Sequence, residues 1–204
     1  MRYLIPKLAE TNIHVAEIEI ERSRFIAWIA HTPDVTGFDA LLARARATYP
    51  DASHHCSAFI AGPPGEQNAI GFSDDGEPGG TAGRPMFQVL EGSGFGQIGC
   101  VVTRYFGGTK LGTGGLARAY SQAVQKALET LPSTNFVERS TLRIQVGFAG
   151  EAEARAWFAG QDVPIEHVDY ASDGVTLTVG WPRDTTIDLA PLEARLKGRL
   201  ALLG

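Results

Sequence analysis

The sequence predicts an α+β protein of two domains, each with helices layered on a sheet. Strand-like and helix-like patterns follow one another along the chain, and the pattern changes character near residue 135. The Pro-Ser-Thr-Asn run at 132–135 is the best candidate linker. A length of 204 residues suits two small domains. We place them at residues 1–134 and 135–204.

The first domain opens with a strand over 16–20, where apolar residues alternate with glutamates. Residues 25–30 continue as a more buried strand. Asp34 precedes a helix whose apolar residues fall on one face, and Pro50 ends that helix. A further strand is expected at 53–61.

Glycine dominates the middle of the chain, because 16 of the 24 glycines lie between residues 62 and 115. A short helix is predicted from residue 84, followed by an apolar, β-branched strand over 98–103. A loop over 107–115 then leads into a long amphipathic helix. These elements predict a two-layer α/β first domain.

In the second domain, the sequence predicts a strand over 142–148, a helix over 151–158, and a hairpin of strands at 165–170 and 175–181. Regularly spaced leucines predict a final helix: Leu189, Leu192, Leu196, Leu200 and Leu203. The order βαββα predicts a small ferredoxin-like domain, with helices on an antiparallel sheet.

Composition narrows the functional classes. Cys56 and Cys100 lie inside apolar runs, so we expect buried thiols and a cytoplasmic protein. No signal-peptide pattern or membrane-length apolar run occurs, and no membrane contact is expected. The net charge of −5 excludes a generally basic nucleic-acid binder. Any site for RNA or another anion must therefore be a local patch.

Two kinds of polar cluster carry candidate chemistry. His54 and His55 are neighbours in a predicted strand and should point to opposite faces, so at most one faces a site. The acids Asp74, Asp75 and Glu77 have three possible roles: binding a hard cation, acid/base catalysis, or structuring the loop and pairing with arginines. Their spacing is not that of an EF-hand, and we favour the structural role, with no metal and no cofactor.

Two glycine-rich segments are candidate anion cradles, because each precedes a helix. For residues 79–85, tight packing is an equally good explanation. Residues 103–115 contain neither a Walker nor a Rossmann motif, but combine glycine with cations and with Tyr105 and Phe106, which can stack on a ring. The predicted ligand-binding residues are Arg84, Arg104, Tyr105, Gly107, Gly108, Lys110, Gly114, Gly115 and Arg118.

These motifs resemble the YigZ/IMPACT family, in family order and over roughly residues 18–130. The stretches that carry the resemblance are SRFIA at 23–27, HHC at 54–56, FSDDGEP at 72–78, GTAGRP at 80–85, and VTRYFGG, KLGTGGL and RAY between 102 and 120. The layout of the tail resembles that of bacterial members with a small ferredoxin-like domain. The family usually has serine where Gly79 stands and an aromatic residue where Ser57 stands. These departures remove one hydroxyl and one stacking surface.

The resemblance implies that the first domain is similar to the second domain of a small-subunit ribosomal protein. It implies that the second is similar to a ferredoxin-like domain of elongation factor G. Eukaryotic relatives look like translational regulators that bind a ribosome-associated protein, but they carry a different partner domain. A bacterial chain therefore does not inherit that role directly.

We expect a translation-associated binding module, with RNA, a ribosome-associated protein or a phosphate-bearing ligand as partner. The alternative is a hydrolase or transferase acting on a phosphorylated or peptide-like small molecule through Asp74, Asp75 or Glu77. A third interpretation is a protein–protein scaffold. A cleft in which acids, a histidine and Lys110 converge favours the enzyme. A basic, aromatic surface with its acids held by arginines favours the binding module.

Overall fold

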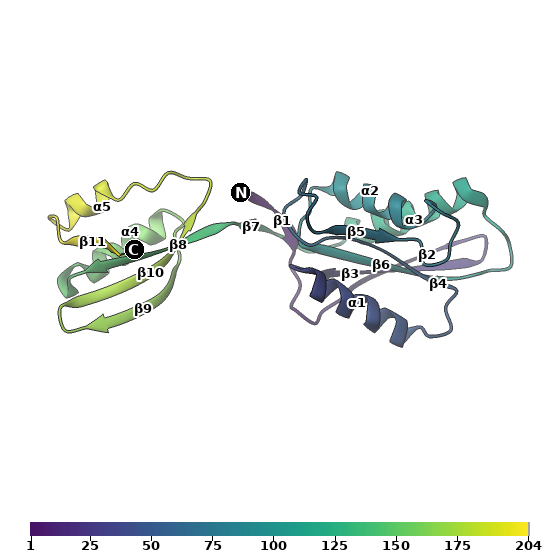
Figure 1. Cartoon of the computed structure of the whole chain (residues 1–204), viewed down its shortest axis with the longest axis horizontal. Coiled ribbons are helices and arrows are strands. Elements are labelled where there is room, and N and C mark those ends of the chain that lie inside the picture. The colour runs from purple at the N-terminus through teal and green to yellow at the C-terminus, as the bar shows by residue number, and fades with distance from the viewer. Residues whose placement is uncertain (204) are drawn as a thin grey trace. The chain divides into compact units, whose positions relative to one another are not determined.

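The computed structural model describes residues 1–203 and divides the chain into two compact units. One unit comprises Tyr3–Phe136, and the other joins Met1–Arg2 to the chain from Val137 onward (Figure 1). The predicted α+β class with two domains is confirmed. The boundary between residues 134 and 135 stays a prediction. Within residues 1–203, no helix has the length and apolar character needed to cross a membrane.

A five-stranded antiparallel sheet forms the centre of the larger unit, with strand order β2-β3-β6-β4-β5. Its strands are β2 (His14–Ile20), β3 (Ser23–His31), β4 (His54–Ile60), β5 (Ile70–Ser73) and β6 (Ile98–Tyr105). Its helices are α1 (Val35–Thr48), α2 (Gly83–Ser93) and α3 (Gly112–Glu129). The predictions for this unit did not include the short strand β5, nor β1 (Arg2–Pro6).

Helices cover both faces of this sheet, so the predicted two-layer arrangement is wrong and the unit has three layers. Helices α2 and α3 lie on one face and α1 on the other (Figure 1). The cause is visible in β3, where every residue from Phe25 to Ala30 is buried. Alternate residues pack toward α2 and α3, and the others toward α1. An uninterrupted apolar strand needs cover on both faces.

Two boundaries differ from the sequence prediction. The predicted linker at 132–135 belongs largely to strand β7 (Ser133–Val137), which pairs with β1. Helix α3 begins at Gly112, not after Gly115, so the predicted loop supplies the first helical turn. Gly112 has a φ of +71°, which lets the chain turn sharply into the helix.

The smaller unit is ferredoxin-like, with the antiparallel strand order β11-β8-β10-β9. Its elements are β8 (Arg139–Val146), the 3-10 turn η1 (Phe148–Gly150), α4 (Glu151–Gly160), β9 (Ile165–Ala171), β10 (Gly174–Pro182), α5 (Ala190–Arg195) and β11 (Leu200–Leu203). The predicted final helix is wrong beyond Arg195. Lys197 and Gly198 have positive φ and end the helix, and the last leucines form a strand on β8.

Candidate functional site

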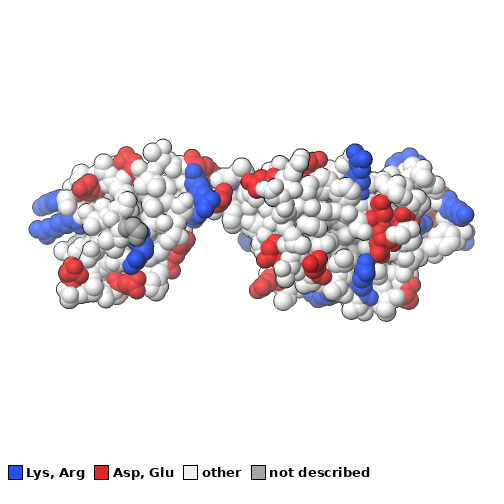
Figure 2. Space-filling model, in the orientation of Figure 1, with Lys and Arg blue, Asp and Glu red and all other residues white. Residues whose placement is uncertain are grey.

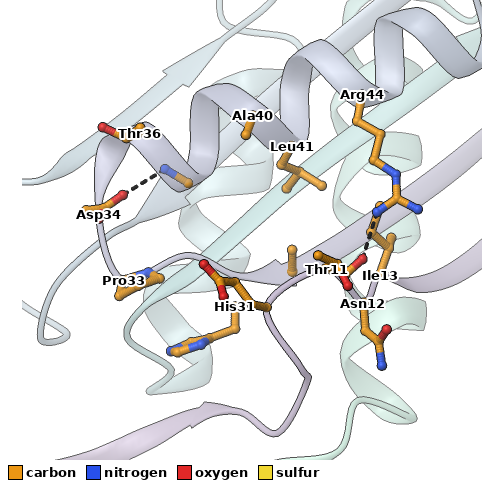
Figure 3. Close-up of a pocket in the computed structure, with 13 residues that line it drawn as sticks. Thr11, Asn12, Ile13, His31, Pro33, Asp34, Thr36, Ala40, Leu41 and Arg44 are labelled. Carbon is orange, nitrogen blue, oxygen red and sulfur yellow. Dashed lines mark hydrogen bonds between the residues drawn. The ribbon is translucent and has the colours of Figure 1, made fainter.

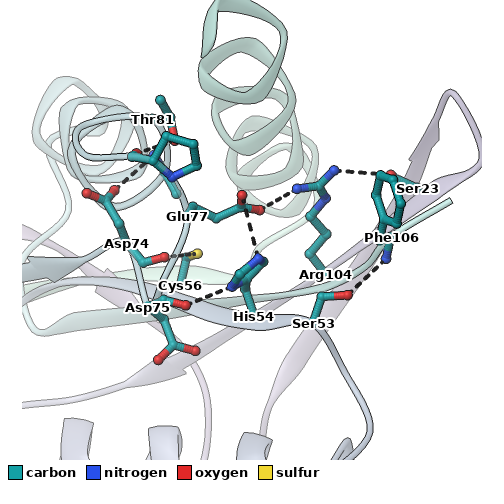
Figure 4. Close-up of polar contacts among 12 residues, drawn as sticks. Ser23, Ser53, His54, Cys56, Asp74, Asp75, Glu77, Thr81, Arg104 and Phe106 are labelled. Carbon is teal, nitrogen blue, oxygen red and sulfur yellow. Dashed lines mark hydrogen bonds and ion pairs between the residues drawn. The ribbon is translucent and has the colours of Figure 1, made fainter. Parts of the chain in front are cut away.

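A buried ion pair lies at the centre of the glycine-rich region (Figure 4). Arg104 on β6 donates from Nη1 to Oε1 of Glu77 at 2.6 Å, and both side chains are at most 6% exposed. The hydroxyl of Tyr120 on α3 donates to the same oxygen at 2.7 Å. Glu77 therefore joins the loop after β5 to the sheet and to α3.

The two histidines of β4 face different surroundings. The Nδ1 of His54 lies 2.8 Å from the carbonyl oxygen of Asp75, and its Nε2 lies 3.7 Å from Glu77 (Figure 4). His55 is buried, with Nδ1 at 3.0 Å from the hydroxyl of Thr103. Burial lowers the pKa of His55, because the charged imidazolium would lose its hydration. His54 is thus the histidine beside the ion pair.

Each of the three acids already has protein partners. Asp74 accepts hydrogen bonds from the backbone N–H groups of residues 80, 82 and 83. Burial opposes ionisation of Asp74, but these three bonds outweigh it and lower its pKa. Asp75 accepts from Arg46 at 2.9 Å and from the backbone of His55 at 2.7 Å. Across residues 1–203, no group of three or more His, Cys, Asp or Glu side chains is placed to hold a metal ion.

The first glycine-rich segment is filled by the protein itself. The Asp74 carboxylate sits where an external anion would meet the start of α2. Gly83 packs so closely that a Cβ there would lie 2.6 Å from the backbone of Ser73. Packing and an internal carboxylate therefore account for residues 79–85. Arg84 is exposed on α2, outside the cavity described next.

The second glycine-rich segment borders an open cavity of about 340 Å³. Leu111 precedes α3 without a side-chain cap, and the first turn of the helix carries no acid. Unpaired N–H groups and a partial positive charge are general properties of such a helix start. The cavity lining combines both charges with glycine and an aromatic ring: Glu77, Arg104, Phe106, Lys110, Gly112 and Thr113.

The two aromatic residues predicted to stack on a ligand lie on different faces. Phe106 is 51% exposed, lines the cavity and lies 5.6 Å from the Arg104 guanidinium. Tyr105 donates instead to Asp51 at 2.8 Å. Adjacent residues of a strand point to opposite sides, so Tyr105 and Arg104 diverge at the end of β6. Only Phe106 adjoins the cavity.

Within residues 107–118, residues 110–113 and Leu116 line the same opening. The N–H of Gly107 donates to Oγ of Ser23 at 3.1 Å, and a Cβ at Gly107 would overlap the backbone of Arg22 and Ser23. Arg118 is exposed over the first turn of α3, where a Cβ at Gly114 would lie 3.3 Å from its Nη1. Lys110 and Arg118 therefore flank the start of α3.

Several partners were not predicted from sequence. Ser23 accepts from both Arg104 and Gly107, and it had been noted only as part of the SRFIA motif. Tyr120 was noted as part of the RAY motif, but its bond to Glu77 was not predicted, since the two residues are 43 positions apart. The Cys56 thiol donates to the carbonyl of Asp74 at 3.0 Å, and burial raises its pKa.

The distribution of charged side chains on the visible face is consistent with a local anion site rather than a broad basic surface. Figure 2 shows acidic and basic side chains interspersed on each unit, without an extended basic area on that face. The net charge of −5 makes the same point for the chain as a whole. A site for an anion would therefore depend on a few local cations rather than on a broad basic surface.

Residues 21–128 match a family model described as the Impact N-terminal domain. An IMPACT family member of Haemophilus influenzae is 47% identical over 146 residues, covering 72% of this chain and 69% of the relative. The IMPACT family member YigZ of Escherichia coli is 40% identical over 202 residues, covering 98% and 97%. A solved structure, described as that of a hypothetical protein, aligns with a TM-score of 0.69 and 40% identity, covering 99% and 96%.

Proposed function

The chain belongs to the IMPACT family, and on that premise we propose that it is a binding module for a phosphate-bearing ligand, with single-stranded RNA as the preferred form. The ligand binds at the start of α3, where Lys110 lines the opening and Arg118 is exposed over the first helical turn. The resemblance of both domains to proteins of the translation machinery supports a link to translation at the level of the fold.

The observation that carries this proposal is the difference between the two glycine-rich helix starts. At α2, the backbone N–H groups are taken by the Asp74 carboxylate. At α3, the first turn has neither a capping side chain nor an acid, and a cavity with Lys110 and Arg104 in its lining lies beside it. Such an uncapped helix start beside cations is suited to bind an anion from outside the chain.

The aromatic ring distinguishes RNA from a simple phosphate. Phe106 is half exposed and lies beside the cations, so a base can stack on it while the adjacent phosphate meets Lys110.

The state of the three acids favours a binding function over a catalytic one. Asp75 and Glu77 are held by arginines and Asp74 by backbone N–H groups, so none is left as an unengaged acid or base.

The test is fluorescence anisotropy with a labelled ten-nucleotide uridine RNA at several salt concentrations. Two or three phosphate contacts predict a log–log salt slope of about −1.4 to −2, at about −0.7 per contact for a single strand. The Lys110→Ala/Arg118→Ala double variant should bind at least about tenfold more weakly and lose about 1.4 of that slope. Phe106→Ala should weaken RNA binding without changing the slope.

A matched control is Lys126→Ala, which removes an exposed cation from the far end of α3. It should leave both affinity and slope unchanged. The proposal fails if the wild-type protein does not bind the RNA at low salt, or if the double variant binds as tightly as wild type. A different result would show a phosphate site without base recognition. In that case inorganic phosphate competes with the RNA, and Phe106→Ala binds the RNA as tightly as wild type.

A further inference from the structure

A second and larger cavity, of about 720 Å³, lies in the Tyr3–Phe136 unit (Figure 3). It is bounded by α1, the end of β3 and the loop at 10–13. Because α1 covers the opposite face of the sheet from α2 and α3, this cavity is separate from the opening beside Lys110. Cavities of this size, lined by apolar groups with a few polar ones, are typical of small-molecule sites.

One stripe of α1 makes the hollow. Gly37, Ala40, Leu41 and Arg44 follow a spacing of three or four residues and face the same side of the helix. Gly37 and Ala40 are small, so they leave space between α1 and the loop, while Leu41 is buried and forms an apolar floor. Ala40 is exposed and is not part of the packed core.

A fixed cation stands at one end of the cavity. Arg44 donates from Nη1 to the carbonyl oxygen of Thr11 at 2.7 Å, and its guanidinium lies 5.9 Å from the ring centre of Trp28. Figure 3 shows Arg44 beside Thr11 and Ile13, away from Asp34 and Thr36. A guanidinium has five N–H donors, so one bond to Thr11 leaves donors for a carboxylate.

Acceptors stand at the other end. Gln97 donates from Nε2 to the hydroxyl of Tyr3, so its oxygen is the acceptor that faces Nε2 of His31 at 2.7 Å. Nε2 of His31 therefore donates to this oxygen, and Nδ1 is the ring nitrogen left to accept from a ligand. Asp34 accepts from the N–H of Gly37 through one carboxylate oxygen, which leaves the second as another acceptor.

The spacing of these ends sets the length of the ligand. Asp34, the N-cap of α1, and Arg44 are ten positions apart, about 15 Å along the helix axis at 1.5 Å per residue. The Arg44 side chain leans toward the helix N-terminus, which shortens that span. Three extended residues reach about 10 Å. With Glu10 as a second acid, the lining is more negative than positive, which disfavours a purely anionic ligand.

We propose that this cavity binds a short, extended peptide of about three residues with free ends. An extended chain advances about 3.3–3.6 Å per residue. Its terminal amine meets Asp34 and His31, its carboxylate meets Arg44, and an apolar side chain lies over Leu41. The required chemistry is that of an amphoteric ligand with charges at both ends. This separates the cavity from the phosphate site on the other face.

The test is isothermal titration of the full chain with alanyl-leucyl-alanine, compared with the N-acetylated and the C-amidated forms. Each modification should weaken binding by about tenfold or more, the effect of losing one hydrogen-bonded charge. In Arg44→Gln, the amidated and free-acid peptides should bind equally, while acetylation should still weaken binding. That pattern assigns the carboxylate to Arg44.

A second experiment tests the cavity by filling it with a larger side chain. Ala40→Phe places a ring in the cavity and should abolish binding, whereas Ala47→Phe, an exposed position of the same helix outside the cavity, should leave it unchanged. Thermal unfolding of both variants shows that the fold is intact. Peptide binding that survives Ala40→Phe, insensitivity to acetylation, or no saturable heat with the free peptide would each overturn the proposal.

Discussion

Glu77 and Arg104 form an ion pair at 2.6 Å with both side chains almost fully buried, 27 residues apart in sequence. One end belongs to the acidic loop and the other to the central strand β6. The pair holds the loop, the sheet and the cavity beside α3 in one arrangement. Its energetic weight is open to direct measurement.

Removing either partner should destabilise the protein strongly. Glu77→Gln and Arg104→Met each leave an uncompensated group in the interior, at a cost of about 3–5 kcal/mol. The double variant should cost clearly less than the sum of the two, because the partners share one interaction. Urea unfolding measures all three. Glu129→Gln, which breaks an exposed pair with Lys126, is the control and should cost no more than about 0.5 kcal/mol.

Asp74 should stabilise the fold in a pH-dependent way. Its pKa is lowered from 3.8 in the folded protein, so its carboxylate stabilises the fold above that value. The stabilisation is lost as the pH falls through the lower, folded pKa. Asp74→Asn should cost about 1.5–3 kcal/mol at neutral pH, the range for hydrogen bonds to charged groups, and progressively less below pH 4. Asp39→Asn, an exposed change on α1, should show no such trend.

Divalent cations should have little effect on thermal stability. A ligand that binds only the native state raises the melting temperature, but the three acids are already engaged by N–H groups and arginines. We expect no saturable shift with magnesium or manganese in differential scanning calorimetry. A clear shift that disappears in Asp75→Asn would contradict this and would support the catalytic alternative.

Both cysteines should resist alkylation in the folded protein. Burial raises the pKa of Cys100 to about 12 and also raises that of Cys56. The reactive thiolate is then scarce at pH 8, and the rate with iodoacetamide should be about a thousandfold below that of the unfolded chain. Mass spectrometry with and without urea measures the two rates. Rapid labelling of folded protein would show that this core opens easily.

Two glycines should respond in opposite ways to alanine. Gly107→Ala forces a methyl group into the backbone at Arg22 and Ser23 and should be severely destabilising. Gly114→Ala meets only the flexible end of Arg118 and should be neutral or stabilising by up to about 1 kcal/mol. Melting temperatures test both. If Gly114→Ala keeps its stability but loses RNA affinity, the bare backbone of that turn serves the ligand.

Sequence patterns predicted most of the fold, because burial leaves a regular period in a strand or a helix. The strand around Ala16 and Ile18, the helix after Asp34 and the hairpin near Gly174 were all predicted correctly. The final helix was predicted to be too long, because the helical spacing of Leu192 and Leu196 extends to the leucines of the strand at 200–203. The turn at Lys197 and Gly198 separates them, and helical spacing alone did not reveal it.

The candidate site was predictable in composition but not in connection. Local patterns identified the acids, the glycines and the cations, yet not which acid pairs with which partner. The bonds from Arg46 to Asp75 and from Tyr120 to Glu77 span 29 and 43 residues and depend on how α1 and α3 pack on the sheet. Strand alternation alone separates Tyr105 from Arg104, but it does not tell which of them faces the cavity.

The contact of Gly107 with Ser23 has a thermodynamic consequence. The hairpin turn at Glu21 and Arg22, where both residues have positive φ, lies against this loop and holds it before any ligand arrives. The proposed ligand should therefore lose less affinity to ordering this segment. Association should be fast and governed by diffusion and charge, and the heat-capacity change of binding should reflect only the stacked ring rather than coupled folding.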